Sequence, residues 1–111
     1  MKAKTINDSP VTGTIYIDNI SEKDAQKCQI RIKVANKYIF PNEQPGNPKT
    51  YSLNFNHNNS EFTASYSIGS KDGKSRSGVL KFGHYEYTGL LNIKEGSDLK
   101  ITKLSENKYT I

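Results

Sequence analysis

Apolar and polar side chains alternate with a period of two along most of this chain. Because successive side chains of a strand point to opposite faces of a sheet, the alternation predicts short strands with one buried face. The apolar positions that carry the pattern are Ile15 and Ile17; Ile30, Ile32 and Val34; Tyr51, Leu53 and Phe55; Phe62, Ala64, Tyr66 and Ile68; Leu80 and Phe82; Leu91 and Ile93; Leu99 and Ile101; and Tyr109 and Ile111. Seven or eight such strands favour an antiparallel barrel or sandwich.

Residues typical of tight turns stand between several of the predicted strands. Asp72-Gly73 is a strong hairpin signal, because a type I′ turn requires positive φ at both central positions. His57-Asn58-Asn59 separates two alternating segments and predicts a second hairpin. These turns agree with an antiparallel arrangement.

Only one short helix stands out. Ser21 is its predicted N-cap, Asp24 three residues later forms a weak capping box, and the helix is expected to run to about Cys28. No internal repeat, low-complexity tract or linker divides the chain. We predict a single all-β domain over residues 1–111, with one or two short helices and with residues 1–12 as a loose N-terminal segment.

The composition excludes several classes of protein. No apolar run approaches the roughly 20 residues that cross a bilayer. The basic residues at positions 2 and 4 precede no apolar segment of the kind found in a secretory signal. Cys28 is the single cysteine, so no internal disulfide can form, which fits a reducing compartment. We expect a soluble, cytoplasmic protein without a membrane partner.

The charge adds a bias toward polyanions. Sixteen basic and eleven acidic residues give a net charge of +5, which a Lys-rich surface that serves solubility explains equally well. Both arginines lie in the two stretches where basic residues outnumber acidic ones, residues 30–50 and 67–94. Arginine binds phosphate and guanine through two parallel hydrogen bonds, which lysine cannot do. The position of the charge therefore favours nucleic acid.

Candidate catalytic groups are few. The histidines are His57, expected to be a solvated side chain in an Asn-rich turn, and His84, which has no carboxylate at a metal-ligand spacing. Glycine-rich phosphate-binding motifs are absent from the sequence. A nuclease site from Glu61, Asp72 and Lys74 is conceivable, but surface carboxylates among lysines are common. We expect a non-catalytic domain that has no metal and no cofactor.

The most informative segment spans residues 69–78. It combines three cations, three hydroxyls and three glycines with no apolar side chain. One interpretation is a long polar hairpin tip around Asp72-Gly73. The other is a flexible basic arm whose Lys, Arg and Ser side chains contact phosphates and base edges. The second basic stretch, residues 31–37, favours the functional interpretation, because a groove needs two walls.

Four motifs together resemble the B-three-type DNA-binding pseudobarrel of plant transcription factors and of several restriction endonucleases. They span roughly residues 13–111. The motifs are Gln29-Ile30-Arg31-Ile32-Lys33-Val34 followed by Tyr38-Ile39-Phe40-Pro41; Phe62-Thr63-Ala64-Ser65-Tyr66; Ser75-Arg76-Ser77-Gly78-Val79-Leu80-Lys81-Phe82-Gly83; and Leu91-Asn92-Ile93-Lys94-Glu95-Gly96-Ser97-Asp98-Leu99-Lys100-Ile101, where Ser97 is inserted into the family's Glu-Gly-Asp turn.

The resemblance implies a seven-stranded open pseudobarrel, mostly antiparallel, that grips the DNA major groove with two arms. By position, the first arm falls near residues 31–37 and the second is residues 70–77. The tryptophans common in the plant members are replaced here by phenylalanine or tyrosine, which favours the restriction-enzyme branch. In that branch the domain recognises the target sequence and a separate nuclease domain or subunit cuts. The chain would then be an excised module or one subunit.

The sequence therefore predicts sequence-specific binding of double-stranded DNA. Lys33, Lys37, Lys71 and Lys74 are expected to contact phosphates, while Asn36, Ser75, Arg76 and Ser77 are expected to reach base edges. The full set of predicted DNA-binding residues is Arg31, Lys33, Asn36, Lys37, Ser70, Lys71, Asp72, Lys74, Ser75, Arg76, Ser77 and Lys81.

Two other functions fit the same sequence. A small β module of a phage or defence system could bind another protein through exposed strand edges and some of the seven tyrosines. A barrel that binds single-stranded nucleic acid needs aromatic side chains facing solvent on adjacent strands. Most aromatic residues here alternate in step with the buried positions of their strands and are expected to face the interior. Binding of single-stranded nucleic acid is therefore the third choice.

Overall fold

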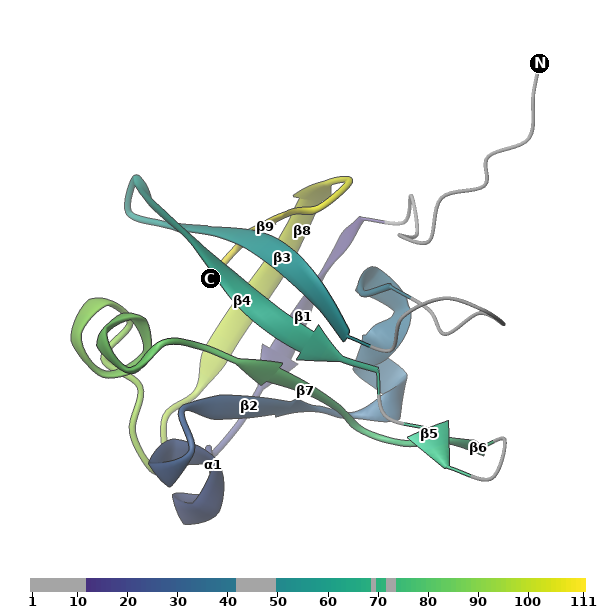
Figure 1. Ribbon diagram of the computed structural model, residues 1–111, viewed down its shortest axis with the longest axis horizontal. Coiled ribbons are helices and arrows are strands. Elements are labelled where there is room, and N and C mark those ends of the chain that lie inside the picture. The colour runs from purple at the N-terminus through teal and green to yellow at the C-terminus, as the bar shows by residue number, and fades with distance from the viewer. Residues whose placement is uncertain (1–11, 42–49, 69, 72–73) are drawn as a thin grey trace.

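The computed structural model describes residues 12–41, 50–68, 70–71 and 74–111 (Figure 1). The predicted loose segment, residues 1–12, falls almost entirely outside this part of the chain. The elements are β1 (Gly13–Ile17), α1 (Glu22–Gln26), β2 (Gln29–Ile32), the 3₁₀-helix η1 (Val34–Ile39), β3 (Thr50–His57), β4 (Ser60–Ser67), β5 (Ser70–Lys71), β6 (Lys74–Ser75), β7 (Gly78–Lys81), the π-helix η2 (Tyr85–Leu90), β8 (Leu99–Ser105) and β9 (Lys108–Thr110).

Seven strands form one mixed sheet that curls into a nearly closed barrel. The strand order is β1-β8-β9-β3-β4-β7-β2, and all pairs are antiparallel except β3 with β9. Since β1 and β2 are the two ends of this order, the barrel is open between them (Figure 1). The predicted all-β fold, a mostly antiparallel, seven-stranded open pseudobarrel, is confirmed. Strands β5 and β6 form a separate two-stranded sheet.

The barrel interior is filled by the apolar phase of the alternating strands. Removing this apolar surface from water is the main favourable contribution to folding. The buried apolar side chains are Ile15, Ile20, Ile30, Ile32, Ile39, Phe40, Leu53, Phe55, Ala64, Tyr66, Ile68, Leu80, Phe82, Tyr87, Ile93, Ile101 and Tyr109. The two-residue period predicts thirteen of these seventeen positions; the four that it does not predict are Ile20, Ile39, Phe40 and Tyr87.

Helix η1 covers part of the open seam between β1 and β2. The Asn36 side-chain amide donates a hydrogen bond to the Tyr16 carbonyl (3.3 Å), and the Tyr38 hydroxyl donates one to the Thr14 carbonyl (3.4 Å). These two carbonyls belong to the edge strand β1. An edge strand with unpaired backbone groups tends to pair with other chains, so η1 protects this edge.

The predicted short helix is present as α1. Its N-cap is Ser21, whose Oγ accepts a hydrogen bond from the backbone N–H of Asp24 (3.2 Å). The helix ends at Gln26 rather than Cys28, because Cys28 has a positive φ of 55° that leaves the helical region. No helix in the described ranges is both long and apolar enough to span a bilayer.

Two predicted strand assignments were wrong. Leu91 and Ile93 follow the π-helix η2 instead of forming a strand, and the Ile93 N–H donates to the Tyr87 carbonyl (2.9 Å) across the left-handed Asn92. Val34 begins η1 and is 51% exposed, so β2 ends at Ile32. Leu91 and Ile93 matched the period of two without pairing in a sheet, whereas Val34 continued the period one position beyond the paired residues of β2.

The predicted hairpin turn at His57-Asn58-Asn59 is confirmed. Residues His57 and Ser60 pair, so Asn58 and Asn59 form a two-residue turn with φ of 50° and 70°. Asparagine tolerates this left-handed conformation better than most residues. The other predicted turn, Asp72-Gly73, lies outside the described residues, although the flanking Lys71 and Lys74 pair in an antiparallel way.

Tyr87 joins η2 to the first part of the chain. Its buried hydroxyl donates to the Gln29 carbonyl (2.9 Å) and lies 3.4 Å from the Asp24 carbonyl. Burial, with smaller contributions from the charges of Asp24 and Cys28, raises the pKa of Tyr87 to about 12. Burial likewise raises the pKa of Tyr66 above its usual value.

The raised pKa values of these tyrosines lead us to expect that the folded protein loses stability at alkaline pH. An unfolded tyrosine deprotonates near pH 10, whereas folded Tyr87 keeps its proton until about pH 12. Its contribution is therefore complete below about pH 10 and is lost as the pH rises toward 12. Thermal unfolding measured from pH 8 to 11.5 should show this decline, and Tyr87→Phe should make the decline shallower. An equal slope in the two proteins would contradict the assignment.

Candidate nucleic-acid interface

The two predicted basic segments leave the same end of the sheet. Strand β2 ends at Ile32, which pairs with Gly78, the first residue of β7. On the other side of β7, Val79 pairs with Ser67, the last residue of β4. The first basic segment (residues 31–37) and the second basic segment (residues 70–77) are therefore neighbours, as Figure 1 shows for η1 and the β5–β6 hairpin.

Lys37 connects the two basic segments directly. Its ammonium donates a hydrogen bond to the Arg76 carbonyl at 2.7 Å, although 39 positions separate the two residues in the sequence. The bond uses the backbone of Arg76 and leaves its guanidinium exposed at the surface. Lys37 had been predicted to contact phosphate; in the structure it holds the second basic segment against the first.

The other residues of the first basic segment differ in their contacts. The Arg31 guanidinium lies 3.5 Å from the Asp24 carboxylate, and the Asn36 amide is bonded to Tyr16. Lys33 is exposed; its carbonyl accepts a hydrogen bond from the Asn36 N–H (2.8 Å), but within the described ranges its ammonium has no hydrogen-bond or ion-pair partner. Lys33 is thus available to bind an anion from solution.

The second basic segment is described in part. The backbones of Ser70, Lys71, Lys74 and Ser75 form the β5–β6 hairpin, and Asp72 lies outside the described residues. Arg76 is exposed, and Ser77, the residue before β7, is half-buried. The segment therefore presents at least one guanidinium beside Lys37.

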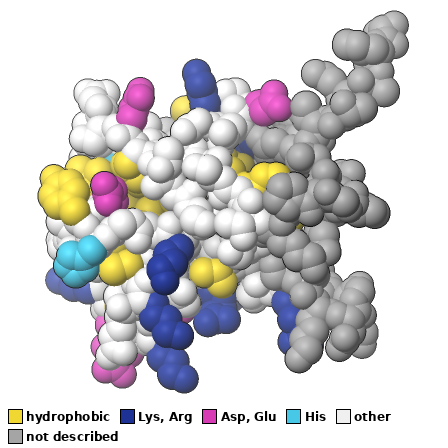
Figure 2. Space-filling view, viewed as in Figure 1, with side chains coloured by type: hydrophobic (Ala, Val, Ile, Leu, Met, Phe, Trp, Pro, Cys, Tyr) yellow, Lys and Arg dark blue, Asp and Glu magenta, His cyan; other side chains and the backbone are white. Residues whose placement is uncertain are grey.

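Lys81 belongs to a hydroxyl-rich outer face that sequence reasoning did not include in the site. On β7 it lies opposite Gln29 of β2 and Ser65 of β4, and Ser65 lies opposite Ser52 of β3. A depression of about 480 Å³ covers this area, and its polar lining side chains are Thr50, Ser52, Thr63, Ser65 and Lys81. The polar phase of the alternation had indicated that Ser52 and Ser65 face outward. Figure 2 shows this face as largely uncharged, with lysine or arginine side chains along its lower part.

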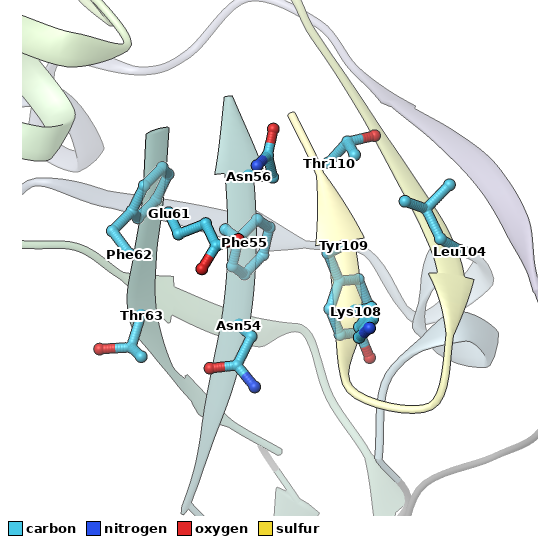
Figure 3. Close-up of a pocket in the computed structure, with 10 residues that line it drawn as sticks. All are labelled: Asn54, Phe55, Asn56, Glu61, Phe62, Thr63, Leu104, Lys108, Tyr109 and Thr110. Carbon is cyan, nitrogen blue, oxygen red and sulfur yellow. The ribbon is translucent and has the colours of Figure 1, made fainter. Parts of the chain in front are cut away.

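A second depression continues the outer face toward β9. It has a volume of about 660 Å³ and shares Thr63 with the first (Figure 3). Asn54 pairs with Thr63 on one side and Lys108 on the other, so polar side chains cross three strands. The outer face therefore offers short hydrogen-bonding side chains between Lys81 and Lys108, with Glu61 as the acidic residue in the lining.

In the described part of the chain, the hydrogen bonds of the histidines and the cysteine involve no residue of the two basic segments. His57, expected to be solvated, is half-buried, and its Nδ1 lies 2.6 Å from the Ile111 carbonyl. Cys28 Sγ lies 3.8 Å from His84 Nδ1, a pairing that the sequence did not indicate. Among the residues described, no three His, Cys, Asp or Glu side chains gather closely enough to hold a metal ion.

The exposed groups of the two basic segments and the outer face include cations, hydroxyls and amides. These are the groups that proteins use to bind phosphate oxygens and to reach base edges. Arg76, Lys33 and Lys81 are exposed together with the hydroxyls of β3 and β4. Comparison of the chain with protein-family models, with curated proteins and with solved structures finds no match.

Proposed function

We propose that this chain binds duplex DNA in a sequence-specific manner, through its two basic segments in the major groove. One observation carries the proposal: both segments leave the same end of one sheet, and the Lys37–Arg76 hydrogen bond holds them together. Two cationic segments in fixed relative positions can contact one duplex at the same time. A surface with lysines scattered over it for solubility would not hold two cationic segments side by side.

The residues of this interface divide into two roles. Lys33, Lys71, Lys74 and Lys81 neutralise phosphates, which supplies affinity and makes binding depend on salt. Arg76 makes the main base contact, because its guanidinium can donate two hydrogen bonds to the two acceptors of a guanine. Asn36, Ser75 and Ser77 are secondary base contacts.

The protein's setting is part of the same proposal. The open seven-stranded pseudobarrel and the motifs described above support a B-three-type recognition domain of a bacterial restriction system in the cytoplasm. Such a domain is itself non-catalytic, and a nuclease domain or subunit would act beside it. The proposal thus assigns recognition to this chain and cleavage to a partner.

The test is selection of a binding site from a random duplex pool, followed by titration of the selected duplex at several salt concentrations. Four phosphate contacts predict a loss of affinity of about a hundredfold between 50 and 200 mM salt. A selected site that binds tightly with this salt dependence supports the proposal. Failure to enrich any sequence, together with binding that is indifferent to salt, would contradict it.

Arg76→Ala is expected to weaken binding to the selected duplex by about 1–3 kcal/mol and to relax the preference at one base position. The reason is the loss of a bidentate contact to a base edge. The matched control is Lys100→Ala, which removes an exposed cation from β8, where it pairs with Tyr16 of β1. Gel-shift titration of both variants gives the comparison. Equal affinities of Arg76→Ala and the unmodified protein would show that Arg76 has been misassigned.

One observation favours the alternative, a module that binds another protein. Tyr16, Tyr38 and Val34 are 65%, 47% and 51% exposed, and they come from β1 and η1 at the seam of the barrel. Tyrosine is enriched at protein interfaces. A tyrosine-centred interface responds little to salt, so the titration that tests DNA binding also separates the two functions.

A further inference from the structure

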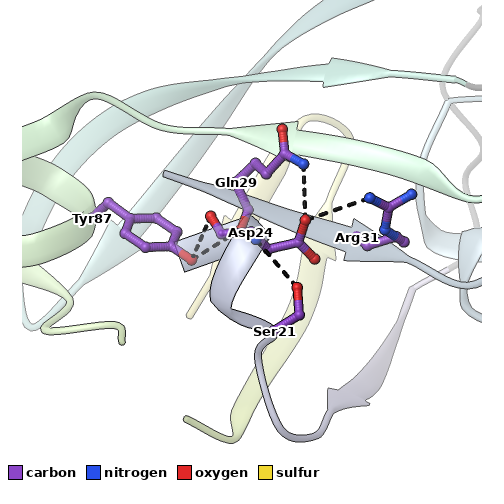
Figure 4. Close-up of polar contacts among 5 residues, drawn as sticks. All are labelled: Ser21, Asp24, Gln29, Arg31 and Tyr87. Carbon is purple, nitrogen blue, oxygen red and sulfur yellow. Dashed lines mark hydrogen bonds and ion pairs between the residues drawn. The ribbon is translucent and has the colours of Figure 1, made fainter. Parts of the chain in front are cut away.

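Asp24 is a nearly buried carboxylate that contacts a residue of the first basic segment (Figure 4). Only 5% of the residue is exposed. Its Oδ1 accepts a hydrogen bond from the Gln29 side-chain amide at 2.8 Å and lies 3.5 Å from Arg31 Nη2. Its backbone N–H is bonded to Ser21, and Tyr87 reaches its carbonyl. Gln29 and Arg31 therefore hold the carboxylate, while Ser21 and Tyr87 hold the backbone that carries it.

The partner of this carboxylate is exposed to solvent on its other side. The Arg31 side chain is 56% exposed, against 7% for that of Asp24. A guanidinium has five N–H donors, and the contact with Asp24 involves one of its two terminal nitrogens. The other donors remain available at the surface. Asp24 thereby anchors the Arg31 side chain through one nitrogen, and most of the N–H donors of the guanidinium have no partner in the described structure.

The anchored guanidinium lies beside the exposed cation of the same segment. Arg31, Lys33 and Asn36 line a pocket of about 250 Å³ at the seam, together with Tyr16 and Asp18. On the sheet, Arg31 lies opposite Val79, which pairs with Ser67 at the end where the second basic segment begins. Its position therefore continues the proposed DNA interface across β2 and β7.

We propose that Asp24 is a positioning residue of this interface: it holds the Arg31 guanidinium in the orientation in which it meets the DNA backbone. This inference rests on the proposed function. Anchoring Arg31 before the complex forms reduces the side-chain freedom lost on binding. The anchor thus favours binding even though it is itself negatively charged.

Whether loss of the Asp24 charge weakens or strengthens DNA binding distinguishes a positioning role from a general electrostatic effect. Removing an anion near a DNA interface raises the net positive charge and should strengthen binding through long-range attraction. Removing an anchor should weaken binding. Asp24→Asn makes both changes, because the amide keeps an oxygen that can accept from Gln29 but no longer pairs with the cation. The two mechanisms therefore predict opposite results for one variant.

The experiment compares Asp24→Asn with Asp18→Asn by anisotropy titration on the selected duplex at low and moderate salt. Asp18 is exposed and lines the same pocket, but no ion pair joins it to Arg31 in the described structure. We expect Asp24→Asn to weaken binding about three- to tenfold, and Asp18→Asn to leave it equal or stronger. In the Arg31→Ala background, Asp24→Asn should produce no further loss.

Arg31→Lys is the companion variant, because it keeps the charge and alters only a half-exposed side chain. It should weaken binding to a similar extent with an unchanged melting temperature, which keeps the test decisive if Asp24→Asn folds poorly. Affinity equal to or above that of the unmodified protein in either variant would overturn the positioning role while DNA binding stands. Absence of salt-dependent binding by the unmodified protein would instead reject the proposed function itself.

Discussion

Replacing Phe40 by alanine is expected to lower the free energy of unfolding by about 3–5 kcal/mol. The ring is fully buried and stacks on Tyr66 at 4.8 Å and on Tyr109 at 5.3 Å between centroids. Its removal leaves a cavity between two rings that are themselves packed in the barrel. The loss is measured as a shift of the urea midpoint at constant m-value.

The same substitution should also loosen the first basic segment. Phe40 follows η1 directly, and the preceding Ile39 carbonyl accepts a hydrogen bond from the Tyr109 hydroxyl at 2.8 Å. Val34→Ala, at an exposed position of the same helix, is the control and should change stability by less than about 0.5 kcal/mol. A loss below 1 kcal/mol for Phe40→Ala would mean that the stack contributes little.

Gly78→Ala is expected to destabilise the fold by about 3 kcal/mol. A Cβ at this position would lie 2.5 Å from the Tyr66 hydroxyl and 2.7 Å from Tyr66 Cε1. Tyr66 cannot move aside, because its ring is fully buried and stacked on Phe40. For a domain of this size the loss corresponds to a melting temperature lower by roughly 12–24 °C, which calorimetry measures directly.

Two controls separate the clash from other effects. Gly96→Ala places a methyl in open space at φ +87°, so it costs only the backbone strain of about 1–2 kcal/mol. Tyr66→Phe removes a buried hydroxyl that has no hydrogen-bond partner among the described residues, so alone it should be close to neutral. Combined with Gly78→Ala, it should restore part of the lost stability. No recovery in the double variant would contradict the steric explanation.

The period-two pattern was sufficient for the fold class but not for the topology. It placed Leu53 and Phe55 inside the barrel because the seven residues from Thr50 to Asn56 alternate in β3. It failed at Leu91 and Ile93, where two apolar residues are too few to distinguish a strand from a chain leaving a helix. The parallel pairing of β3 with β9 depends on contacts between distant segments, on which local patterns carry no information.

The sequence predicted where the charged residues of the candidate site lie along the chain, but it did not predict which contacts they make. The basic segments follow from composition, but the bond from Lys37 ends on a backbone carbonyl, which no side-chain pattern reveals. Asp24 was expected only as part of a helix cap, because its spacing from Ser21 suggested a local role. Its contact with Arg31 depends on how α1 packs beside β2. The hydroxyls of β3 and β4 were recognised as outward-facing but not as neighbours of Lys81.

The tight turn at Asn58 and Asn59 is a suitable position for attaching a fluorescent label. It joins β3 and β4 at their far end, whereas residues Thr50 and Ser67 pair at the end where the basic segments begin. Seven residue steps along a strand separate the two ends by roughly 24 Å. A fluorophore attached at Asn59 would thus lie clear of a duplex bound at the basic segments, yet within energy-transfer range of a dye on that duplex, so binding could be followed in real time.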